Sequence, residues 1–513
     1  MKATTFANLL ADPKSAQPAI IVEANGVAIS YRALAEQVER LAEGFRGAGL
    51  RAGDAVVLVL PNGPELLVLL LALARAGLIA VPLNPALKAD ELHGLFADAE
   101  PRAIVAASGN GVVAEGAAGL AVPIWAASVD PSGTVSLAGM PPGHRGALES
   151  PNAEDVALCL HTSGTEGRPK IVPLTHANVL HVAQHIASHY ALSPADRTLV
   201  VMPLFHGHGL IGAALATLVS GGALIVPSRF SASRFWGSFR RHGGTWYTAV
   251  PTIHQILLLR ADADGAPHSG PRFLRSCSAS LAPAVLAALE NRFGAPVIEA
   301  YGITEASHQV ASNPLPPRPR RTGTVGPGVG IEIAILDANG RHLPAHQAGA
   351  VVIRGPGVMH GYRNNPTASA AAFADGWYRT GDAGVLDDDG YLTLTGRIKE
   401  LINRGGEKIS PTEIDHVLLE HPAVAEAATF GVPDSKYGEE VQAAVVLKGS
   451  ADAEDLRAFC REHLADFEVP TVIRIVSTLP KNALGKLERR ALTALYAPKH
   501  QILSNSVTPR RAT

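Results

Sequence analysis

The residues from His161 to His176 read HTSGTEGRPKIVPLTH and have the composition of a phosphate-binding loop. Hydroxyl groups, glycines and a lysine stand close together here: Thr162, Ser163, Gly164, Thr165, Gly167 and Lys170. Glycine lets main-chain N–H groups approach phosphate oxygens closely, and hydroxyls and a cation add further contacts. The segment before the loop, DVALCLHTS, is typical of an apolar strand, and HANVLHVAQHIASHY after it has helical spacing. A strand, a glycine-rich turn and a helix in this order predict a nucleotide phosphate site.

This loop differs from the P-loop of the common NTPases. The P-loop has four residues between its glycines, and a Ser or Thr directly follows its Gly-Lys pair. Here Pro169 precedes Lys170, Ile171 follows it, and only two residues separate Gly164 from Gly167. Taken alone, the segment is equally compatible with an ordinary surface loop, so its assignment depends on other motifs.

A second group of polar residues follows the predicted strand PVIEA, in the segment EAYGITEASHQ from Glu299 to Gln309. Gly302 permits a tight turn at the strand end, where α/β proteins usually bind their ligands. Thr304 offers a hydroxyl for a phosphate oxygen, and the Glu305 carboxylate suits Mg²⁺, which prefers oxygen ligands. The ring of Tyr301 is expected to stack on a purine. In isolation, these residues would be ordinary polar side chains at a strand end.

Three further motifs follow towards the C-terminus. GWYRTGDAG holds Asp382 between turns, where its carboxylate can accept hydrogen bonds from ribose hydroxyls or cap its own turn. GRIKE contains Arg397 and Lys399 and taken alone is a charged connector. LPKNALGKLERRAL carries Lys486 on a predicted loop, where an isolated lysine is usually solvated.

The elements that position these motifs change character along the chain. From about residue 20 to 330, helical patterns alternate with short apolar strands, which predicts a layered α/β fold with largely parallel strands. Segments from Thr322 to Arg397 are rich in turns and predict hairpins of an antiparallel sheet or small barrel. After Ile398 comes a unit of about 115 residues with its own helices and strands. The expected division is 1–396 for the nucleotide-binding domain, 397–400 for a hinge, 401–497 for a C-terminal lid domain and 498–513 for a flexible tail.

Composition limits the class of protein. The chain has 513 residues, of which 47% are hydrophobic and 18% charged, so we expect a globular protein with two or more domains. A formal charge of −2 gives no reason to expect nucleic acid or an anionic membrane as a partner. The three cysteines, Cys159, Cys277 and Cys460, are scattered and suit a reducing compartment.

No membrane segment is predicted. Between Glu65 and Arg75 stand only nine uncharged residues, well short of the roughly 20 that a spanning helix needs. A buried helix leading into a strand is therefore expected there. The N-terminus lacks a long apolar region, so we expect no secretory signal and a cytoplasmic location.

Together and in this order, the loop, YGITE, TGD, GRIKE and PKNALGK resemble the motifs of the adenylate-forming enzymes. That family includes acyl-CoA synthetases, peptide-synthetase adenylation domains and luciferases, and the resemblance covers nearly the whole chain. Two loop positions depart from the family's usual motif: Glu166 stands where Thr is common, and Ile171 stands where Gly is common. The resemblance implies a large N-terminal domain of layered α/β sheets with a small β-barrel-like subdomain. A small, mobile α+β C-terminal domain is expected to follow it.

The resemblance also implies a reaction in two steps. A carboxylate attacks the α-phosphate of ATP to give an acyl-adenylate and pyrophosphate, in the presence of Mg²⁺. The small domain then rotates, and the thiol of CoA displaces AMP.

Site residues follow from the same resemblance. The implied catalytic residues are Lys486, Glu305 and Thr304, and the implied Mg²⁺ ligands are Glu305 and Thr165. The implied nucleotide-binding residues are Thr162, Ser163, Gly164, Thr165, Gly167, Lys170, Ala300, Tyr301, Gly302, Thr304, Asp382, Arg397 and Lys486. Gly405 and Gly406 are expected to line the CoA path, and Lys399 to act as the hinge of the rotation.

The pocket for the acid is expected between the phosphate loop and YGITE, and its residues are unusually polar. Imidazoles and hydroxyls gather there: His206, His208, His254, Ser278, Ser280 and His308. Trp246 and Tyr247 are bulky enough to shorten the pocket. Clustered histidines and serines suit a short, strongly polar acid, particularly one with a second carboxylate. Each histidine taken separately is more often a structural residue.

Within the family, FHGHG, TWYTAVPTIHQ, RSCSASLAP and TEASH resemble the oxalate–CoA ligases of plants and fungi most closely. This resemblance makes oxalate the expected acid, held by His208, Ser280 and His308, with His254 close by. Gly302-Ile303 departs from the Ala-Met that those ligases tend to carry.

Alternatives remain open at this point. Malonate or another short carboxylic acid would suit the same chemistry, and a carrier protein could replace CoA as thiol acceptor. A non-catalytic nucleotide-binding protein with this fold is the alternative from a different class. The sequence does not distinguish a monomer from a homodimer.

Overall fold

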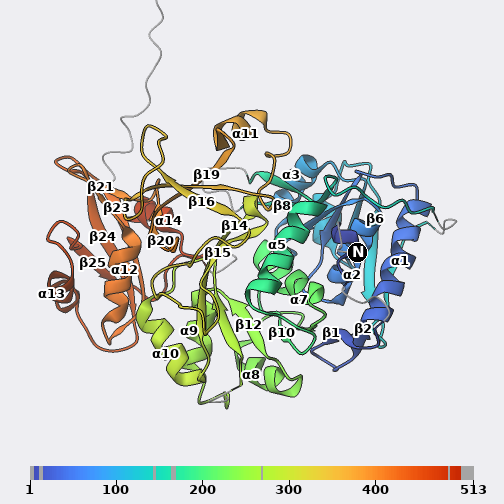
Figure 1. Cartoon of the computed structure of the whole chain (residues 1–513), viewed down its shortest axis with the longest axis horizontal. Helices are drawn as coiled ribbons and strands as arrows, with labels where there is room; N and C mark the ends of the chain where they lie inside the picture. The colour runs from blue at the N-terminus through green and yellow to red at the C-terminus, as the bar shows by residue number, and fades with distance from the viewer. Residues whose placement is uncertain are drawn as a thin grey trace, which may run out of the picture.

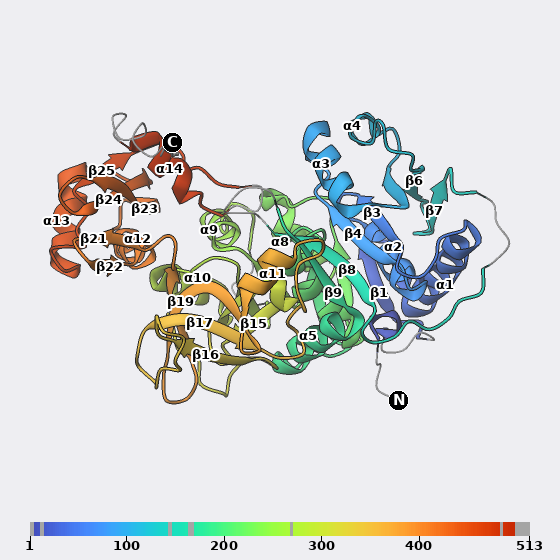
Figure 2. The same cartoon turned by 90° about the horizontal axis from the view of Figure 1, so that it is seen from above.

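The computed structural model describes residues 5–10, 15–141, 146–162, 169–266, 270–482 and 486–497. Across these residues the strands form four sheets, with eight, seven, five and five strands. In both views the last five-stranded sheet lies at the opposite end of the molecule from the seven-stranded sheet (Figures 1 and 2). The predicted tail, 498–513, lies outside the described residues.

The seven-stranded sheet has the order β7-β6-β5-β3-β4-β8-β9 and is parallel except at its edges, where β7 and β9 run antiparallel. Its strands are β3 (Ala55–Val59), β4 (Ile79–Leu83), β5 (Ala103–Ala107), β6 (Ile124–Val129), β7 (Val135–Ala138), β8 (Val156–His161) and β9 (Ile171–Thr175). The helices along this part of the chain are α1 (Tyr31–Gly47), α2 (Pro64–Arg75), α3 (Ala89–Ala99) and α4 (Gly111–Gly116).

The eight-stranded sheet has the order β15-β14-β13-β12-β10-β11-β1-β2, again with antiparallel edges. Its strands are β1 (Pro18–Val22), β2 (Ala28–Ser30), β10 (Arg197–Leu199), β11 (Ala223–Val226), β12 (Trp246–Ala249), β13 (Phe273–Ser276), β14 (Val297–Ile303) and β15 (His308–Ser312). Its helices are α5 (His176–His189), α6 (Gly207–Gly209), the π-helix η2 (Leu210–Leu215), α7 (Ala216–Val219), α8 (Ala232–Arg241), α9 (Pro251–Leu259) and α10 (Pro283–Phe293). Two 3₁₀ turns, η1 (Phe6–Asn8) and η3 (Thr304–Ala306), complete this part.

Helix α2 shows why the apolar stretch near residue 70 is a core element. Its sequence PELLVLLLALAR is apolar on all sides, and ten of its residues are buried. A helix of this kind is stable when it is covered on every face. The prediction of a buried helix followed by a strand is confirmed. In the described part of the chain, no helix combines the length and the apolar character that crossing a bilayer requires.

The third sheet is antiparallel and consists of β16 (Glu332–Leu336), β17 (Gly349–Arg354), β18 (Phe373–Ala374), β19 (Trp377–Leu386) and β20 (Leu392–Arg397), with α11 (Pro366–Ala372) beside it. The predicted hairpins are confirmed. Its described pairings run from β16 to β17 and β19 and do not close into a barrel, so this sheet is open.

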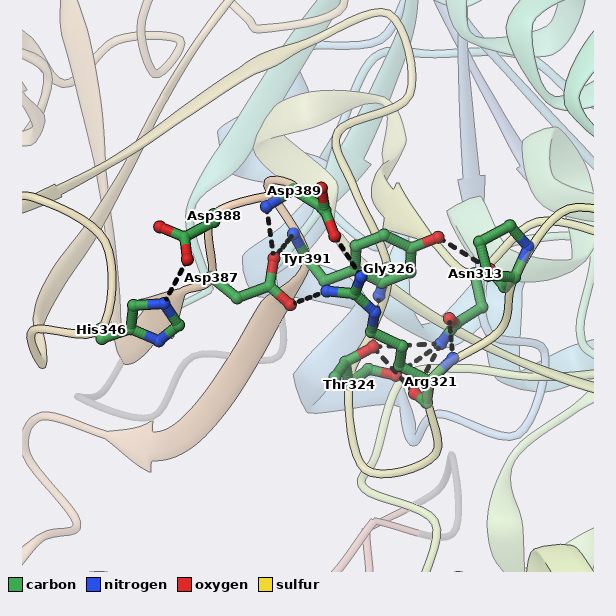
Figure 3. A network of polar contacts seen from close by, with 10 residues as sticks. Asn313, Arg321, Thr324, Gly326, His346, Asp387, Asp388, Asp389 and Tyr391 are labelled. Atoms are coloured by element: carbon green, nitrogen blue, oxygen red, sulfur yellow. Dashed lines mark hydrogen bonds and ion pairs between the residues drawn. The ribbon is translucent and has the colours of Figure 1, made fainter.

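A polar network fixes the turn between β19 and β20 (Figure 3). Arg321 forms ion pairs with Asp387 and Asp389 of this turn. The Tyr391 hydroxyl donates to the carbonyl of Pro319 at 2.7 Å. These contacts attach the segment that follows β15 to the two strands that carry Asp382 and Arg397.

The C-terminal unit has its own sheet and its own core. Five strands, β21 (Ile402–Arg404), β22 (Glu407–Ile409), β23 (Val424–Asp434), β24 (Gly438–Leu447) and β25 (Val472–Ile475), combine with α12 (Pro411–Glu420), α13 (Ala453–His463) and α14 (Arg489–Tyr496). Ile414, Leu418 and Leu456 are buried in its apolar core. The buried Asp415 is paired with Arg489 at 2.6 Å, which connects α12 to α14.

The structure corrects one local prediction. The phosphate loop was expected to run from a strand directly into a helix, but β9 (IVPLT) lies between the loop and α5. Ile171 to Thr175 pair antiparallel with β8, which makes the loop the connection of a hairpin. Helix α5 begins after it, with Thr175 and Asn178 forming a reciprocal cap.

Candidate active site

The ends of the phosphate loop are held together by its flanking residues. The backbone N–H of Thr162 donates to the carbonyl of Lys170 at 3.0 Å, and the N–H of Lys170 donates to the Thr162 hydroxyl at 3.1 Å. Four predicted phosphate contacts, Ser163, Gly164, Thr165 and Gly167, lie outside the described residues.

Tyr362 brings Lys170 and Glu305 to one place. The Lys170 ammonium lies 4.8 Å from the centre of the Tyr362 ring, and the Tyr362 hydroxyl donates to Glu305 Oε1 at 2.9 Å. Glu305 and Thr304 belong to the short turn η3 at the end of β14. The structure therefore places the predicted YGITE residues beside the end of the phosphate loop.

Glu305 fits the way in which nucleotide enzymes commonly hold Mg²⁺. Within the described ranges, no group of three or more His, Cys, Asp or Glu side chains is arranged to hold a metal. Mg²⁺ is usually bound through one or two carboxylates together with substrate phosphates. One carboxylate beside a phosphate loop matches this mode. The other predicted ligand, Thr165, lies in the undescribed part of the loop.

Asp382 is held by two donors. Arg397 Nε donates to its Oδ1 at 2.8 Å, and the hydroxyl of Tyr301 donates to its Oδ2. Burial raises the pKa of Asp382, an effect that Arg397 opposes. Tyr301, which we expected to stack on a purine, is 7% exposed and directs its hydroxyl to Asp382, so little of its ring is available for stacking.

The turn after β14 depends on glycine. A Cβ built at Gly302 would overlap the carbonyl oxygen of His308, because β14 and β15 approach each other closely at an irregularity in their register. Ala300 precedes this point in β14 and is buried. The backbone here leaves no room for a side chain at position 302.

Lys486 interacts electrostatically with residues of the predicted nucleotide site and of the predicted acid pocket. It follows β25, and its backbone N–H donates to Asn482 Oδ1 at 3.1 Å. Burial lowers its pKa, whereas the charges of Asp382 and Glu305 raise it. Its own charge lowers the pKa values of His206, His208 and His308. The terminal lysine is thus within electrostatic reach of both groups of residues.

His208 and His308 lie face to face in the predicted acid pocket. Their rings stack with centroids 5.0 Å apart and an angle of 17° between their planes. His208 Nδ1 lies 3.0 Å from Ser278 Oγ, and its Nε2 lies 2.7 Å from Thr248 Oγ1. Burial lowers the pKa of both histidines well below the ordinary value, which keeps both rings neutral near pH 7.

Ser280 and His254, two of the predicted acid ligands, lie apart from this pair. Ser280 is exposed, and its hydroxyl lies 2.9 Å from Nε2 of His416 on α12. Both ring nitrogens of His254 are used within the protein, by the Tyr247 hydroxyl at 3.2 Å and the carbonyl of Arg275 at 3.1 Å. Both side chains have partners within the protein, and their contact with the acid stays a prediction. Ser278, two residues before Ser280, is the serine that reaches His208.

The two aromatic residues expected to shorten the pocket lie in apolar cores. Trp246 stacks on Phe273 with ring centroids 5.0 Å apart, and Tyr247 packs edge-on against Phe235 at 4.8 Å. They alternate along β12, so their rings belong to different core clusters. Each supports the strand that carries Thr248 and is a core residue.

Arg275 is a residue of the pocket that sequence reasoning missed. It lies in β13, is fully buried, and donates from Nη2 to His308 Nε2 at 3.0 Å and from Nη1 to Thr248 Oγ1 at 2.9 Å. The available signal was an arginine within the short strand FLRS, all four residues of which are buried. Such a residue is rarely buried without a reason.

The residues predicted for CoA and for the hinge lie in and next to the C-terminal unit. Gly405 and Gly406 form the turn between β21 and β22, with φ of 62° and 100°, a conformation that favours glycine. Lys399 lies between β20 and β21, on the connection between the two parts of the chain. These positions are compatible with the predicted roles, which stay predictions.

Comparisons with known proteins give the same assignment as the motifs. A family model described as AMP-binding enzyme matches residues 11–363, and one described as AMP-binding enzyme C-terminal domain matches residues 413–486. Oxalate–CoA ligase from Arabidopsis thaliana is 45% identical, over 92% of this chain and 94% of that protein. Sulfoacetate–CoA ligase from Cupriavidus necator is 40% identical, over 93% of this chain and 94% of that protein.

A solved structure shares the arrangement of the parts. ATP-bound MatB from Rhodopseudomonas palustris superimposes with a TM-score of 0.87 at 32% identity, covering 97% of this chain and 99% of that chain. The resemblance to adenylate-forming enzymes is confirmed. Since one family model alone spans well over half of its length, the protein belongs to the family of AMP-binding enzymes.

Proposed function

We propose that the protein is an ATP-dependent acid–CoA ligase whose acid is oxalate. The observation that carries the proposal is the stacked, neutral pair His208 and His308 with a fully buried guanidinium, Arg275, behind it. This group of donors lies within electrostatic reach of Lys486, which also interacts with Asp382 and Glu305. A small anionic acid bound there would lie next to the nucleotide.

The first step joins two anions. A carboxylate oxygen of the acid attacks the α-phosphorus of ATP, the new O–P bond forms, and pyrophosphate leaves. Lys486 reduces the repulsion between carboxylate and phosphate and neutralises charge that develops in the transition state. When bound, Mg²⁺ supplies charge neutralisation on the phosphates, and Glu305 would hold it. Asp382 and Arg397 would orient the ribose.

The second step transfers the acyl group to CoA. The thiol attacks the carbonyl carbon of the acyl-adenylate, the C–S bond forms, and AMP leaves with the electrons of the C–O bond. We propose that 401–497 rotates about 397–400 between the steps, with Lys399 in the hinge and Gly405 and Gly406 beside the CoA path. The separate family matches to 11–363 and 413–486 support division of the chain in this region.

The choice of oxalate rests on the charge of the pocket. Oxalate and sulfoacetate, the acids in the names of the two relatives, both carry a second anionic group close to the reacting carboxylate. Neutral histidines and a hydroxyl can donate to such a group, and Arg275 supplies the positive charge. A medium-chain acid would place methylene groups against these buried polar atoms, at the cost of their desolvation.

AMP release measured with ATP, CoA and a panel of oxalate, malonate, sulfoacetate, propionate and hexanoate tests the proposal. We expect the highest kcat/KM for oxalate. Propionate or hexanoate exceeding oxalate by a wide margin would rule out a pocket for dianions. A higher kcat/KM for malonate or sulfoacetate than for oxalate would support the ligase activity but would show that oxalate is not the preferred acid.

Two further measurements separate the other classes. A nucleotide-binding protein without catalysis would release neither AMP nor pyrophosphate with any acid of the panel. An enzyme that loads a carrier protein would release pyrophosphate normally but would form no thioester when CoA is the thiol acceptor.

A further inference from the structure

Arg275 is a fully buried cation with neutral partners. Its guanidinium donates to the Tyr190 hydroxyl at 2.9 Å, to Thr248 Oγ1 at 2.9 Å, to His308 Nε2 at 3.0 Å and to Gln309 Oε1 at 2.8 Å. The side chain of Cys277 is a further hydrogen-bond partner. Among the described residues, none of the ion pairs to Asp or Glu includes it. A buried charge without a counter-ion is costly, and a bound anion would lower this cost.

The donors of Arg275 determine the positions of nearby hydrogens. A guanidinium can only donate, so Thr248 Oγ1 accepts from Arg275. Among the described contacts of this hydroxyl, the one acceptor for its own hydrogen is His208 Nε2, 2.7 Å away. The neutral His208 ring then carries its hydrogen on Nδ1 and donates to Ser278 Oγ at 3.0 Å. This assignment leaves the hydroxyl hydrogen of Ser278 for a ligand.

The same reasoning applies to His308. Its Nε2 accepts from Arg275 Nη2, so the neutral ring carries its hydrogen on Nδ1. Both histidines are therefore the same tautomer, and both are oriented by one guanidinium, directly in His308 and through Thr248 in His208.

The backbone around the two rings supports this arrangement. Ser278 and His308 have φ of 73° and 91°, left-handed values that non-glycine residues adopt at some cost and that cluster at functional sites. Gly212, in the π-helix η2, packs so closely on His308 that a Cβ there would lie 2.5 Å from Nε2. Helix, strand and guanidinium together fix the orientation of this imidazole.

We propose that Arg275 is a positioning and specificity-determining residue for the acid substrate. Through Thr248 it makes Ser278 a hydrogen-bond donor to the acid, and through His308 it fixes the second donor. Its uncompensated charge favours acids with a second anionic group over acids with one. This inference rests on the proposed acid–CoA ligase function and extends it to the origin of selectivity.

The test compares Thr248→Val with Thr248→Ser, because both keep Arg275 and only the first removes the hydroxyl. We expect Thr248→Val to raise KM for oxalate about 10- to 100-fold, the range for loss of hydrogen bonds that involve charge. KM for ATP should stay within about twofold, and Thr248→Ser should restore most of the affinity.

A second experiment tests whether the charge of Arg275 favours acids with a second anionic group. Arg275→Gln should lower the ratio of kcat/KM for oxalate to kcat/KM for glycolate, a monoanion of similar size, about tenfold or more. Tyr190→Phe is the matched control, because it removes an acceptor of Arg275 Nε and keeps the acceptors Thr248 and His308 and the charge of Arg275. It should leave this ratio within about twofold of the wild type.

Several outcomes would overturn the proposal. One is an unchanged oxalate KM in Thr248→Val, and another is an unchanged oxalate-to-glycolate ratio in Arg275→Gln. Equal increases of KM for oxalate and ATP, with a lowered melting temperature, would mean that these residues act only on the fold. Failure of oxalate to release AMP with the wild type, while another acid does so, would refute the proposed substrate; the same variants are then measured with that acid.

Discussion

Lys486 is a residue of the C-terminal part of the chain that interacts electrostatically with both the predicted nucleotide residues and the predicted acid pocket. The charges of Asp382 and Glu305 raise its pKa, and its own charge lowers the pKa values of three pocket histidines. A cation in this position can act on the nucleotide and the acid together. Its contribution should belong to the step in which those two anions meet.

Lys486→Ala should reduce acid-dependent pyrophosphate release about 100- to 1,000-fold, the usual effect of losing one group that stabilises transition-state charge. Thioester formation from synthetic oxalyl-adenylate and CoA should change only a few-fold. Lys481→Ala is the control, since Lys481 lies nearby and pairs with Glu426 at 2.7 Å. Equal losses in the two steps would contradict the assigned role.

His308→Ala should weaken binding of the acid, because the pocket loses one ring of the stacked pair and leaves Arg275 Nη2 with one fewer acceptor. We expect KM for oxalate to rise at least about tenfold, while KM for ATP changes less than about twofold. His463→Ala, on the exposed side of α13, serves as the control. A parallel rise of both KM values would remove His308 from the acid site.

Glu299 should make stability depend on pH. Burial raises its pKa from the ordinary 4.5 to about 8, so the folded protein keeps a proton that the unfolded chain loses. Its contribution to stability is present below about pH 4.5 and is lost as the pH rises through 8. The free energy of unfolding should therefore fall by up to about 1.4 kcal/mol per pH unit in this window.

Glu299→Gln lacks this proton and keeps an oxygen that can accept from the Gly323 N–H, which donates to Glu299 Oε2 at 3.2 Å. Chemical denaturation at pH 5, 6.5 and 8 should show the variant gaining stability relative to the wild type at each increase in pH. A constant difference between the two proteins would mean that Glu299 is already ionised in the folded state.

At the scale of elements, the hairpin of β14 and β15 sets the geometry of both sites. Tyr301 and Glu305 are proposed to serve the nucleotide and His308 the acid, so eight consecutive positions in the chain would contribute to two pockets. The close approach of the strands at Gly302 fixes His308 relative to Glu305. A change in this approach should affect the acid pocket first, because His308 provides the contact.

Gly302→Ala should therefore force the start of β15 outward. We expect a loss of about 1–3 kcal/mol of stability from overpacking, and a higher KM for the acid. Gly237→Ala is the control, because its Cβ would meet nothing within 4 Å and α8 should tolerate or gain from alanine. Unchanged melting temperature and unchanged KM in Gly302→Ala would show that the hairpin adjusts without cost.

At the scale of the whole molecule, helix α12 of the C-terminal unit contacts α10 and β20 in the described part of the chain. Helix α12 lies near α10, and the Ser280 hydroxyl contacts His416 Nε2 at 2.9 Å across this boundary. Burial lowers the pKa of His416 to about 4, so the imidazole is neutral at pH 7 and this contact carries no charge. In this arrangement Lys486 reaches the nucleotide residues, which suits the adenylation step.

Cross-linking the two parts should separate the steps. In the double variant Ser280→Cys with His416→Cys, a short bismaleimide should hold the present arrangement. Acid-dependent pyrophosphate release should continue for one turnover, while thioester formation should fall at least about tenfold, because the second step needs the rotation. The two single-cysteine variants, treated alike, are the controls. Normal steady-state thioester formation by the linked protein would refute the rotation.

Much of this fold follows from the sequence. Apolar strands such as AVVLVL and IAVPL, and the helical spacing of PTEIDHVLLEHP, carry their pattern within a few residues of chain, so their local structure is predictable. The turn-rich pattern after Thr322 also predicted the antiparallel sheet. By contrast, β9 was missed because IVPLT is too short to be distinguished from the start of the helix that follows it.

The ordered motifs by themselves determined the family, because residue types such as those of YGITE and PKNALGK are fixed by phosphate chemistry. Only the tertiary structure decided which pocket residues face each other. Ser278 and Ser280 are equivalent in sequence, but the left-handed backbone at Ser278 directs its hydroxyl to His208. In the sequence, Arg275 is only one polar residue in a predicted strand. Its proposed role depends on contacts with residues that lie 27, 33 and 34 positions away in the chain. Such contacts depend on how strands are ordered in a sheet, which no local pattern encodes.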